Sequence, residues 1–250
     1  MKHLFKFFCL LALTTFLMSC GGDDDDVSPA DELAQAKLSL TEDATPIEVP
    51  SAMMESTDEK AQLATSYISA ANGISQYLAN FQPPAGATKS STPITASNGR
   101  MAQTQEEYLI YTWSDTEITV AYQISQTTDN YVFEIFFKYK DEAEFVKFIH
   151  AEESKTQRKG FMDIYDIYGG TGNEVVFSYA WEEKADGTFH FDFESADGGF
   201  VMKLVVNPDK SGSLKYYLSG ELYYDINWDA AGNGTWTWYS DPVESGSWTV

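Results

Sequence analysis

The clearest pattern in this sequence is an alternation of apolar and polar residues that begins near Glu106 and continues along the rest of the chain. In residues 131–139 every odd position is apolar, whereas Glu134 and Lys138 occupy even positions. Residues 189–194 repeat the pattern, with phenylalanine alternating with histidine or an acidic residue. A period of two places successive side chains on opposite faces of a β-strand. One apolar and one polar face is typical of antiparallel strands.

Turn signals divide this region into short segments. They are Asp129-Asn130, Gly169-Gly170, Asp186-Gly187, Asp197-Gly198-Gly199, Asn207-Pro208 and Ser219-Gly220. The pattern predicts a mainly β fold, an antiparallel meander of about twelve strands that forms a barrel, a half-barrel or a sandwich. Residues 141–149 have a second interpretation, because Asp141-Glu142-Ala143-Glu144 before apolar residues is also a way to open a short helix.

A short motif occurs three times near the C-terminus. Gly212, Gly234 and Gly246 each follow Ser or Asn and precede a large apolar residue by two positions. We interpret each copy as a turn followed by an apolar side chain that enters the core. The spacing of the copies favours a meander, in which consecutive strands are neighbours.

One helix is predicted before the strands. Ser56 and Glu59 have the spacing of a capping box, with Ser56 as the N-cap. Apolar residues then recur three and four positions apart as far as Phe81, and Pro83-Pro84 ends the segment. The pair Asn72-Gly73 is a point at which this helix is expected to bend most easily. Its role is either a lid or plug over a barrel, or a cover for one face or end of a sheet.

The remaining segments complete the predicted domain organisation. Residues 1–19 are a signal peptide, and residues 20–56 are an acidic, flexible tether that contains Pro29, Pro46 and Pro50. Residues 57–250 form one domain with a helix and a β-meander, and residues 82–104 within it are a loop rich in Pro, Ser and Thr. That length is sufficient for one substantial core.

The N-terminus has the composition of a secretory signal. Lys2 and Lys6 precede an apolar run of about twelve residues, which is too short for a helix that spans a bilayer. An ordinary cleavage site requires small residues at −3 and −1, but here Leu17 occupies −3 and Cys20 follows the break.

Residues 17–20, Leu-Met-Ser-Cys, resemble the lipobox of bacterial lipoproteins. The resemblance implies that Cys20 becomes the first mature residue and carries acyl chains that bind the protein to a membrane. Each buried methylene contributes roughly 0.8 kcal/mol, so two or three acyl chains are a sufficient anchor.

The four consecutive aspartates Asp23, Asp24, Asp25 and Asp26 follow the cysteine after two glycines. Mutual repulsion favours a solvated spacer. A calcium loop is a weaker interpretation, because such loops alternate their ligands around a glycine turn. The run also resembles the surface-export signal of lipoproteins of Bacteroidetes-type bacteria. That resemblance implies an outer-membrane protein facing outward, with a periplasm-facing protein as the alternative.

Charge and cysteine content narrow the possible partners. The formal net charge is −22, which argues against nucleic acid as a partner because phosphate contacts require clustered Lys and Arg. The two cysteines are Cys9, in the predicted signal, and Cys20. The mature domain is therefore expected to fold without disulfides.

Motifs of catalysis are absent from the sequence. It contains no His-Glu-x-x-His, no Gly-x-Ser-x-Gly, no P-loop and no Gly-x-Gly-x-x-Gly pattern. Residues 229–240 resemble a calcium loop, but Ala231 and Ser240 stand at ligand positions, so we interpret the segment as a hairpin turn. We predict a protein that is not an enzyme and that uses no cofactor and no metal.

Aromatic residues supply the candidate ligand-binding positions, which are Trp228, Trp236, Trp238 and Trp248. Trp236 and Trp238 are two positions apart and share one face of a predicted strand. These rings either form an exposed platform for sugars or fill the core, where aromatic residues dominate the buried area.

The function predicted from the sequence is non-catalytic binding by a lipid-anchored envelope protein. In the first hypothesis an apolar or amphipathic small ligand lies inside a β-barrel, beneath the helix. A helix followed by a long meander is loosely similar to lipocalin-like and lipoprotein-carrier folds. The alternatives are glycan binding on exposed aromatic rings and a structural surface protein without a ligand. A barrel that spans the outer membrane also fits the alternation.

Overall fold

A computed structural model describes residues 29–38, 47–79, 81–94, 107–168 and 174–250 of the chain. The predicted signal peptide, Cys20 and Asp23 to Asp26 lie outside these residues. In the described part the chain is mainly β, as the alternation predicts. It contains three helices, which are α1 (Pro29–Gln35), α2 (Ser51–Met54) and α3 (Glu59–Ala79).

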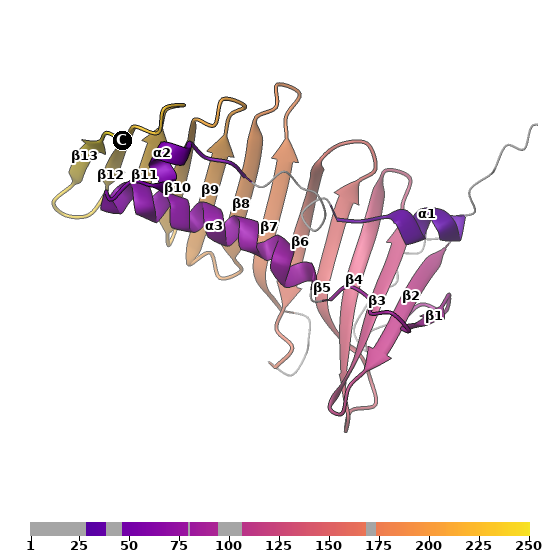
Figure 1. Cartoon of the computed structure of the whole chain (residues 1–250). Helices are drawn as coiled ribbons and strands as arrows, with labels where there is room; N and C mark the ends of the chain where they lie inside the picture. Colours follow the sequence, from indigo (N-terminus) through magenta and orange to yellow (C-terminus); the bar gives the residue numbers. More distant parts are fainter. Residues whose placement is uncertain (1–28, 39–46, 80, 95–106, 169–173) are drawn as a thin grey trace, which may run out of the picture.

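Thirteen strands follow α3 and form one antiparallel sheet, in which every strand pairs with its neighbours in sequence (Figure 1). The strands are β1 (Thr88–Ser90), β2 (Tyr108–Ser114), β3 (Ile118–Gln126), β4 (Asn130–Tyr139), β5 (Val146–Ser154), β6 (Lys159–Tyr165), β7 (Val175–Glu183), β8 (Phe189–Ser195), β9 (Phe200–Val206), β10 (Gly212–Leu218), β11 (Glu221–Trp228), β12 (Gly234–Trp238) and β13 (Glu244–Trp248). The predicted meander is therefore confirmed. Residues 141–149 turn and enter β5, so the short-helix interpretation is wrong.

The sheet remains open. β1 and β13 are its two edges, and they lie at opposite ends of the molecule (Figure 1). A closed barrel, whether it encloses a ligand or spans a membrane, is thus the wrong alternative, and the similarity to closed lipocalin-like barrels does not hold. A sandwich is also wrong for the described residues, because all thirteen strands belong to a single sheet.

Helix α3 lies across one face of this sheet, from the β11–β12 end to β5 (Figure 1). We call this the helix face, and the opposite side the open face. The helix approaches closely because small residues point at the sheet: Ala61 and Ala64 are fully buried. Asp58, rather than Ser56, is the N-cap, since its Oδ1 accepts the backbone N–H groups of Lys60 (2.8 Å) and Ala61 (3.2 Å). The predicted capping box is therefore two residues out of place.

The helix face carries rows of large apolar side chains that continue from strand to strand. One row joins directly paired residues of β7 to β12, which are Trp181, Phe191, Leu204, Leu214, Ile226 and Trp236. Four of these, from Phe191 to Ile226, are at most 1% exposed. Cross-strand pairs of this kind are the unit by which a sheet is stabilised. The main core therefore lies between α3 and the helix face, and a smaller buried cluster of Ile110, Ala121 and Phe136 lies on the open face.

Segments predicted to belong to the flexible tether pack on the sheet instead. Leu33 of α1 and Met53 of α2 are fully buried, and Val49 is 7% exposed. The Asn72 side chain binds the tether backbone twice: its Oδ1 accepts the N–H of Ile47 (2.8 Å), and its Nδ2 donates to the carbonyl of Ile47 (3.1 Å). Asn72 therefore holds residues 47–50 against α3, and the ordered part of the molecule begins before residue 57.

A tryptophan lies over a glycine of the neighbouring strand at four places on the helix face. The pairs are Trp181 over Gly160, Trp228 over Gly212, Trp248 over Gly234 and Trp236 over Gly246. A Cβ atom added at Gly234 meets the Trp248 ring at 2.0 Å, so only glycine leaves room for the indole. This explains the threefold motif near the C-terminus: each glycine receives an aromatic ring from the adjacent strand.

Candidate functional site

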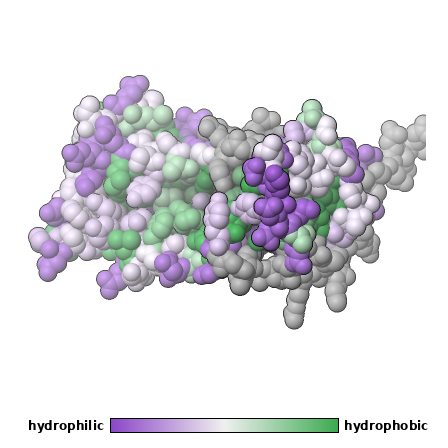
Figure 2. Space-filling view, turned by 90° about the horizontal axis from the view of Figure 1, so that it is seen from below, coloured by the Kyte–Doolittle hydropathy of each residue, from purple (hydrophilic) through white to green (hydrophobic). Residues whose placement is uncertain are grey.

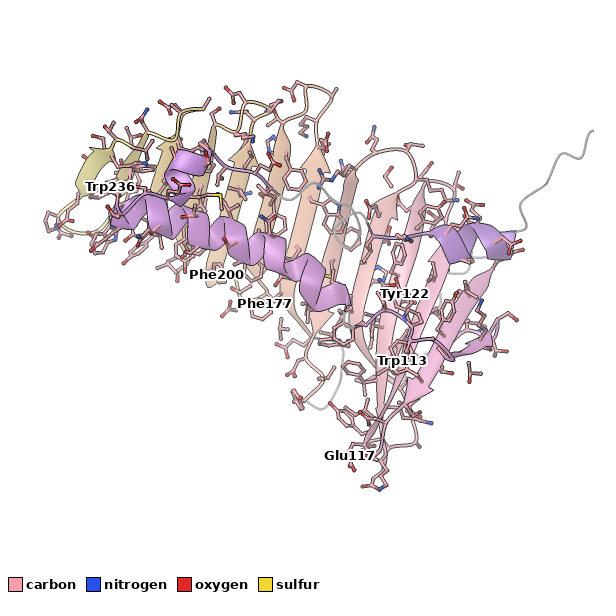
Figure 3. All side chains as sticks on the ribbon, in the orientation of Figure 1. Trp113, Glu117, Tyr122, Phe177, Phe200 and Trp236 are labelled. Carbon is pink, nitrogen blue, oxygen red and sulfur yellow. The ribbon has the colours of Figure 1, made fainter. Side chains whose placement is uncertain are left out.

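An apolar cavity of about 670 Å³ lies between the C-terminal half of α3 and strands β4 to β7. Its lining residues are Ala70, Gly73, Ile74, Phe81, Phe137, Phe148, Met162, Ile164, Tyr165, Asp166, Ile167, Tyr168, Val176, Phe177 and Tyr179. Phe177 lies in β7, near the end of α3 (Figure 3). Seen from below, apolar residues reach the surface in the middle of the molecule, bordered by hydrophilic ones (Figure 2). Volume and lining are both in the range of small-molecule sites.

Small residues on the helix create this space. Gly73 lines the cavity, and a Cβ atom added to it meets no atom within 4 Å. Ala70, one turn earlier, also lines it. A glycine inside a helix costs roughly 1 kcal/mol relative to alanine. From the sequence we expected the helix to bend at Gly73. In the structure, the absence of a side chain at Gly73 leaves space in the cavity.

Aromatic clusters form two walls. At the end of α3, Phe137 and Phe148 stack with ring centroids 4.8 Å apart, and Phe81 packs against both at 5.9 and 5.6 Å. Phe148 is the extra residue of a bulge in β5, which directs it toward Phe137 and Phe81. On the other side, Tyr179 stacks on Phe193 at 4.5 Å. Two sets of packed aromatic rings therefore border the cavity.

The polar groups of the cavity gather where β6 ends. The Asp166 carboxylate accepts the backbone N–H of Tyr168 at 2.8 Å, and the Asp166 N–H donates to the carbonyl of Glu174 at 2.8 Å. The Tyr168 side chain is 86% exposed. The pKa of Tyr139 is raised above its usual value, mainly by burial and to a smaller extent by a hydrogen bond with Tyr168. A carboxylate and exposed tyrosine thus lie at the edge of an otherwise apolar cavity.

Two of the four predicted ligand-binding tryptophans are in the core. Trp228 and Trp248 are each 4% exposed. Their indole N–H groups donate to backbone carbonyls, Trp228 to Lys210 at 2.8 Å and Trp248 to Gly232 at 2.7 Å. The structure therefore places these rings beneath the surface, where their faces are not available to stack on a sugar.

Trp236 and Trp238 are half-buried and share the helix face, as their spacing predicts. With Tyr224 they surround the ammonium of Lys60, whose Nζ lies 4.8 Å from the Trp236 centroid, 5.6 Å from that of Trp238 and 5.2 Å from that of Tyr224. Figure 3 shows Trp236 beside the N-terminal end of α3. A lysine of the chain itself therefore covers the predicted platform.

A polar row crosses the open face of β3 to β7, and it was not predicted. It consists of directly paired residues: Gln123, Glu134, His150, Asp163 and Ser178. Gln123 donates to Glu134 at 2.8 Å, and Ser178 donates to Asp163 at 2.7 Å. Without the strand register, sequence reasoning had no signal to join residues so far apart in the chain.

Glu134 is the electrostatic centre of this row. Its Oε1 lies 2.5 Å from the Lys147 ammonium and 3.4 Å from His150 Nδ1. Burial opposes ionisation of Glu134, but His150 and Lys147 outweigh it and lower the pKa of Glu134 to about 2. The hydrogen bonds and ion pairs of this carboxylate are with Gln123, Lys147 and His150 of the neighbouring strands. We therefore interpret the row as structural.

A smaller cavity of about 230 Å³ is lined by Ile47 and Glu48 and by residues of the sheet and its turns, among them Arg158 and Lys210. Its two cationic residues already have partners, because Arg158 pairs with Glu183 at 3.0 Å and Lys210 with Glu48 at 2.8 Å. Both charges are thus neutralised in place. This cavity is a less suitable site than the apolar one.

The other sequence candidates form local structure. Asp229 Oδ1 accepts the N–H groups of Ala231, Gly232 and Asn233, which confirms the hairpin turn between β11 and β12. Throughout the described ranges, no three His, Cys, Asp or Glu side chains come together to hold a metal ion. Within the same ranges, no helix has both the length and the apolarity to cross a bilayer.

Comparison with known proteins assigns this chain to no family. The chain matches no protein-family model, and no curated protein matches it either.

Proposed function

We propose that this protein is a lipid-anchored, non-catalytic binding protein of the bacterial envelope, and that it holds an apolar or amphipathic small molecule between α3 and the sheet. The cavity of about 670 Å³ is the observation that carries the proposal. It replaces the predicted barrel interior with a site under the helix, on one face of an open sheet.

The size and lining of the cavity support binding rather than simple loose packing. Protein interiors are close-packed, with few voids larger than a water molecule. This cavity is open to solvent, so water contacts its apolar walls, and a ligand that covers them removes apolar surface from water. Nearly all of the walls are aromatic or aliphatic, which suits a hydrocarbon better than ordered water.

The location in the envelope rests on the sequence. The lipobox at residues 17–20 and the acidic run after it support an outer-membrane lipoprotein that faces outward. An acyl anchor holds the domain near a membrane, where apolar and amphipathic molecules are concentrated. Anchor and cavity are thus consistent with one another.

Filling the cavity is the direct test. Gly73→Trp introduces a large side chain at a position where an added Cβ meets open space. We expect residues 21–250, expressed in a bacterial periplasm without the anchor, to carry a non-covalent adduct of lipid-like mass in native mass spectrometry. The Gly73→Trp protein should lose that adduct while it keeps its fold.

Ser69→Trp is the matched control, because it adds the same ring to an exposed position of α3 that does not line the cavity. It should retain the adduct. A bare mass for the unsubstituted protein, persisting after incubation with lipid extracts, would contradict the proposal. So would an adduct that survives Gly73→Trp unchanged.

A further inference from the structure

We propose that the cavity under α3 selects amphiphiles with a positively charged headgroup, an amine or a quaternary ammonium, over those with an anionic headgroup. This inference rests on the proposed function, since it names the ligand class of the same site. It follows from the side chains at the mouth of the cavity and from the charge around it.

Among the described residues that line the cavity, Asp166 supplies the one carboxylate. The other described lining residues are apolar, apart from three tyrosines. No lysine or arginine is among them. A carboxylate or phosphate headgroup would find no cation there to replace its hydration, and burying such a charge without a partner is costly. An ammonium at the same place has Asp166 as a partner.

Aromatic rings accompany this carboxylate. Tyr165, Tyr168 and Phe177 line the same cavity as Asp166, and Tyr168 is largely exposed. A cation is attracted to the face of an aromatic ring, and the attraction increases when the site is partly desolvated. The combination of one carboxylate with several rings suits an alkylammonium, which is both charged and apolar at its surface.

A cation–π contact of the same kind already occurs within this protein. The Lys60 ammonium is held by Tyr224, Trp236 and Trp238, all within 5.6 Å of the charge. Lys147 does not line the cavity, but its Nζ lies 6.0 Å from the ring centroid of Tyr165, which does. Its charge is already compensated by Glu134 at 2.5 Å. Lys147 is therefore not available to an anionic headgroup.

The field of the whole molecule acts in the same direction. The formal net charge is −22, and an acidic molecule repels anionic ligands and raises the local concentration of cations. This long-range contribution weakens with added salt, whereas the contact with Asp166 at the cavity is screened less. At physiological ionic strength, the difference in affinity between cationic and anionic ligands therefore reports mainly the contact with Asp166.

The experiment compares three probes with the same alkyl chain: dodecyltrimethylammonium, 1-dodecanol and dodecanoate. Binding to residues 21–250 is measured by titration calorimetry in 0.15 M salt, below the concentration at which each probe aggregates. We expect the ammonium to bind most tightly and dodecanoate most weakly, with about a tenfold difference in Kd between them.

Asp166→Asn removes the charge but keeps an oxygen that accepts the Tyr168 N–H. It should weaken binding of the ammonium about three- to tenfold and leave 1-dodecanol unchanged. Asp209→Asn is the matched control, because Asp209 accepts the N–H of Ser211, also two residues on, in a turn that does not line the cavity. It should change neither affinity. Gly73→Trp should abolish the binding of all three probes.

The two levels of the proposal fail differently. If no probe binds, or if Gly73→Trp leaves binding unchanged, the apolar site itself is wrong. If Gly73→Trp abolishes binding but dodecanoate binds as tightly as the ammonium, the charge selection is wrong and the apolar site stands. Equal loss of ammonium binding in Asp166→Asn and Asp209→Asn would also overturn the selection, because it would reduce the effect to net charge.

Discussion

At the scale of single residues, Glu134 shows how a polar group is accommodated on the open face. Its side chain is 13% exposed and is bound by Gln123 and Lys147 from both neighbouring strands. Removing one partner of such a pair leaves the other partly buried without compensation, which costs more than the pair itself contributes. The row therefore restricts which strands can be neighbours, in addition to any stability that it provides.

We expect Glu134→Gln to lower the free energy of unfolding by about 2 kcal/mol at pH 7. Because the fold lowers the pKa of Glu134 from its ordinary value of 4.5 to about 2, its contribution is fully present above about pH 4.5. That contribution is lost as the pH falls toward 2. Urea unfolding followed by tryptophan fluorescence at pH 7 and pH 3 measures both effects.

Glu194→Gln is the control for this prediction. Glu194 follows Ser178 in the same row, but it lies at its exposed end. Its substitution should change stability by less than about 0.5 kcal/mol. If Glu134→Gln lost as much stability as the unsubstituted protein between pH 7 and pH 3, the assignment of that acid sensitivity to Glu134 would be wrong.

The buried face of the strands was predictable at residue resolution, and the contacts across strands were not. Alternation alone assigns Phe133 and Phe191 to an apolar face and Glu134 to the other. That Glu134 meets His150, or that Trp248 lies over Gly234, depends on register, which is set by turns and bulges distributed over the whole sheet. The bulge at Phe148 is one such feature, and nothing in the local sequence marks it.

At the scale of elements, α3 is held to the sheet at both ends. Its first turns lie over Trp236 and Trp238 through Lys60, and Phe81, beyond its last turn, packs on Phe137 and Phe148. Between these two attachments lies the cavity. The helix is thus attached to the sheet on both sides of the cavity.

Lys60→Met tests the first attachment, because methionine retains an apolar chain but carries no charge. We expect it to lower the free energy of unfolding by about 0.5–2 kcal/mol through the lost contact of the ammonium with the rings. Lys203→Met, which removes an exposed ion pair with Asp192 on the open face, is the control and should cost about 0–1 kcal/mol. Equal effects in thermal or urea unfolding would mean that the rings contribute nothing specific to Lys60.

The helix was predictable as an element, but its surroundings were not. Its apolar spacing and the prolines after it are local signals, and they located it correctly to within a few residues. The segments with Leu33 and Met53 carry too few apolar residues for periodicity to detect, so they were assigned to the tether. Their burial depends on the sheet, which begins only at Thr88 and continues to Trp248, far from both segments in the sequence.

At the scale of the whole molecule, α3 covers one face of the thirteen-stranded sheet and leaves the other without a helix in the described part of the chain (Figure 1). Open twisted sheets seldom exceed about ten strands without closing or splitting. Closure into a barrel requires strand tilt and stagger to be consistent around the circle. Alternation carries no information on either, so the strand number was nearly right, whereas the barrel interior favoured for the ligand was wrong. The cavity was inaccessible to sequence reasoning for the same reason.

Stability should therefore vary along the sheet, highest beneath α3 and lowest at the edges. Phe191 of β8 and Leu204 of β9 are covered by α3 and almost fully buried, and both strands are paired on two sides. β13 has five residues and pairs only with β12, and most of its side chains are exposed. Local opening is easiest where few apolar contacts must be broken.

Hydrogen exchange followed by mass spectrometry measures this gradient. We expect peptides that cover β13 and β1 to exchange first, and those that cover β8 and β9 to exchange last. An occupied cavity should slow exchange in β5 to β7 and in the second half of α3, and leave β13 unchanged, because a ligand stabilises the region that it contacts. Uniform protection along the sheet would mean that it opens as one cooperative unit. The edges would then be as stable as the strands beneath the helix, and the single covered face could not be the main source of stability.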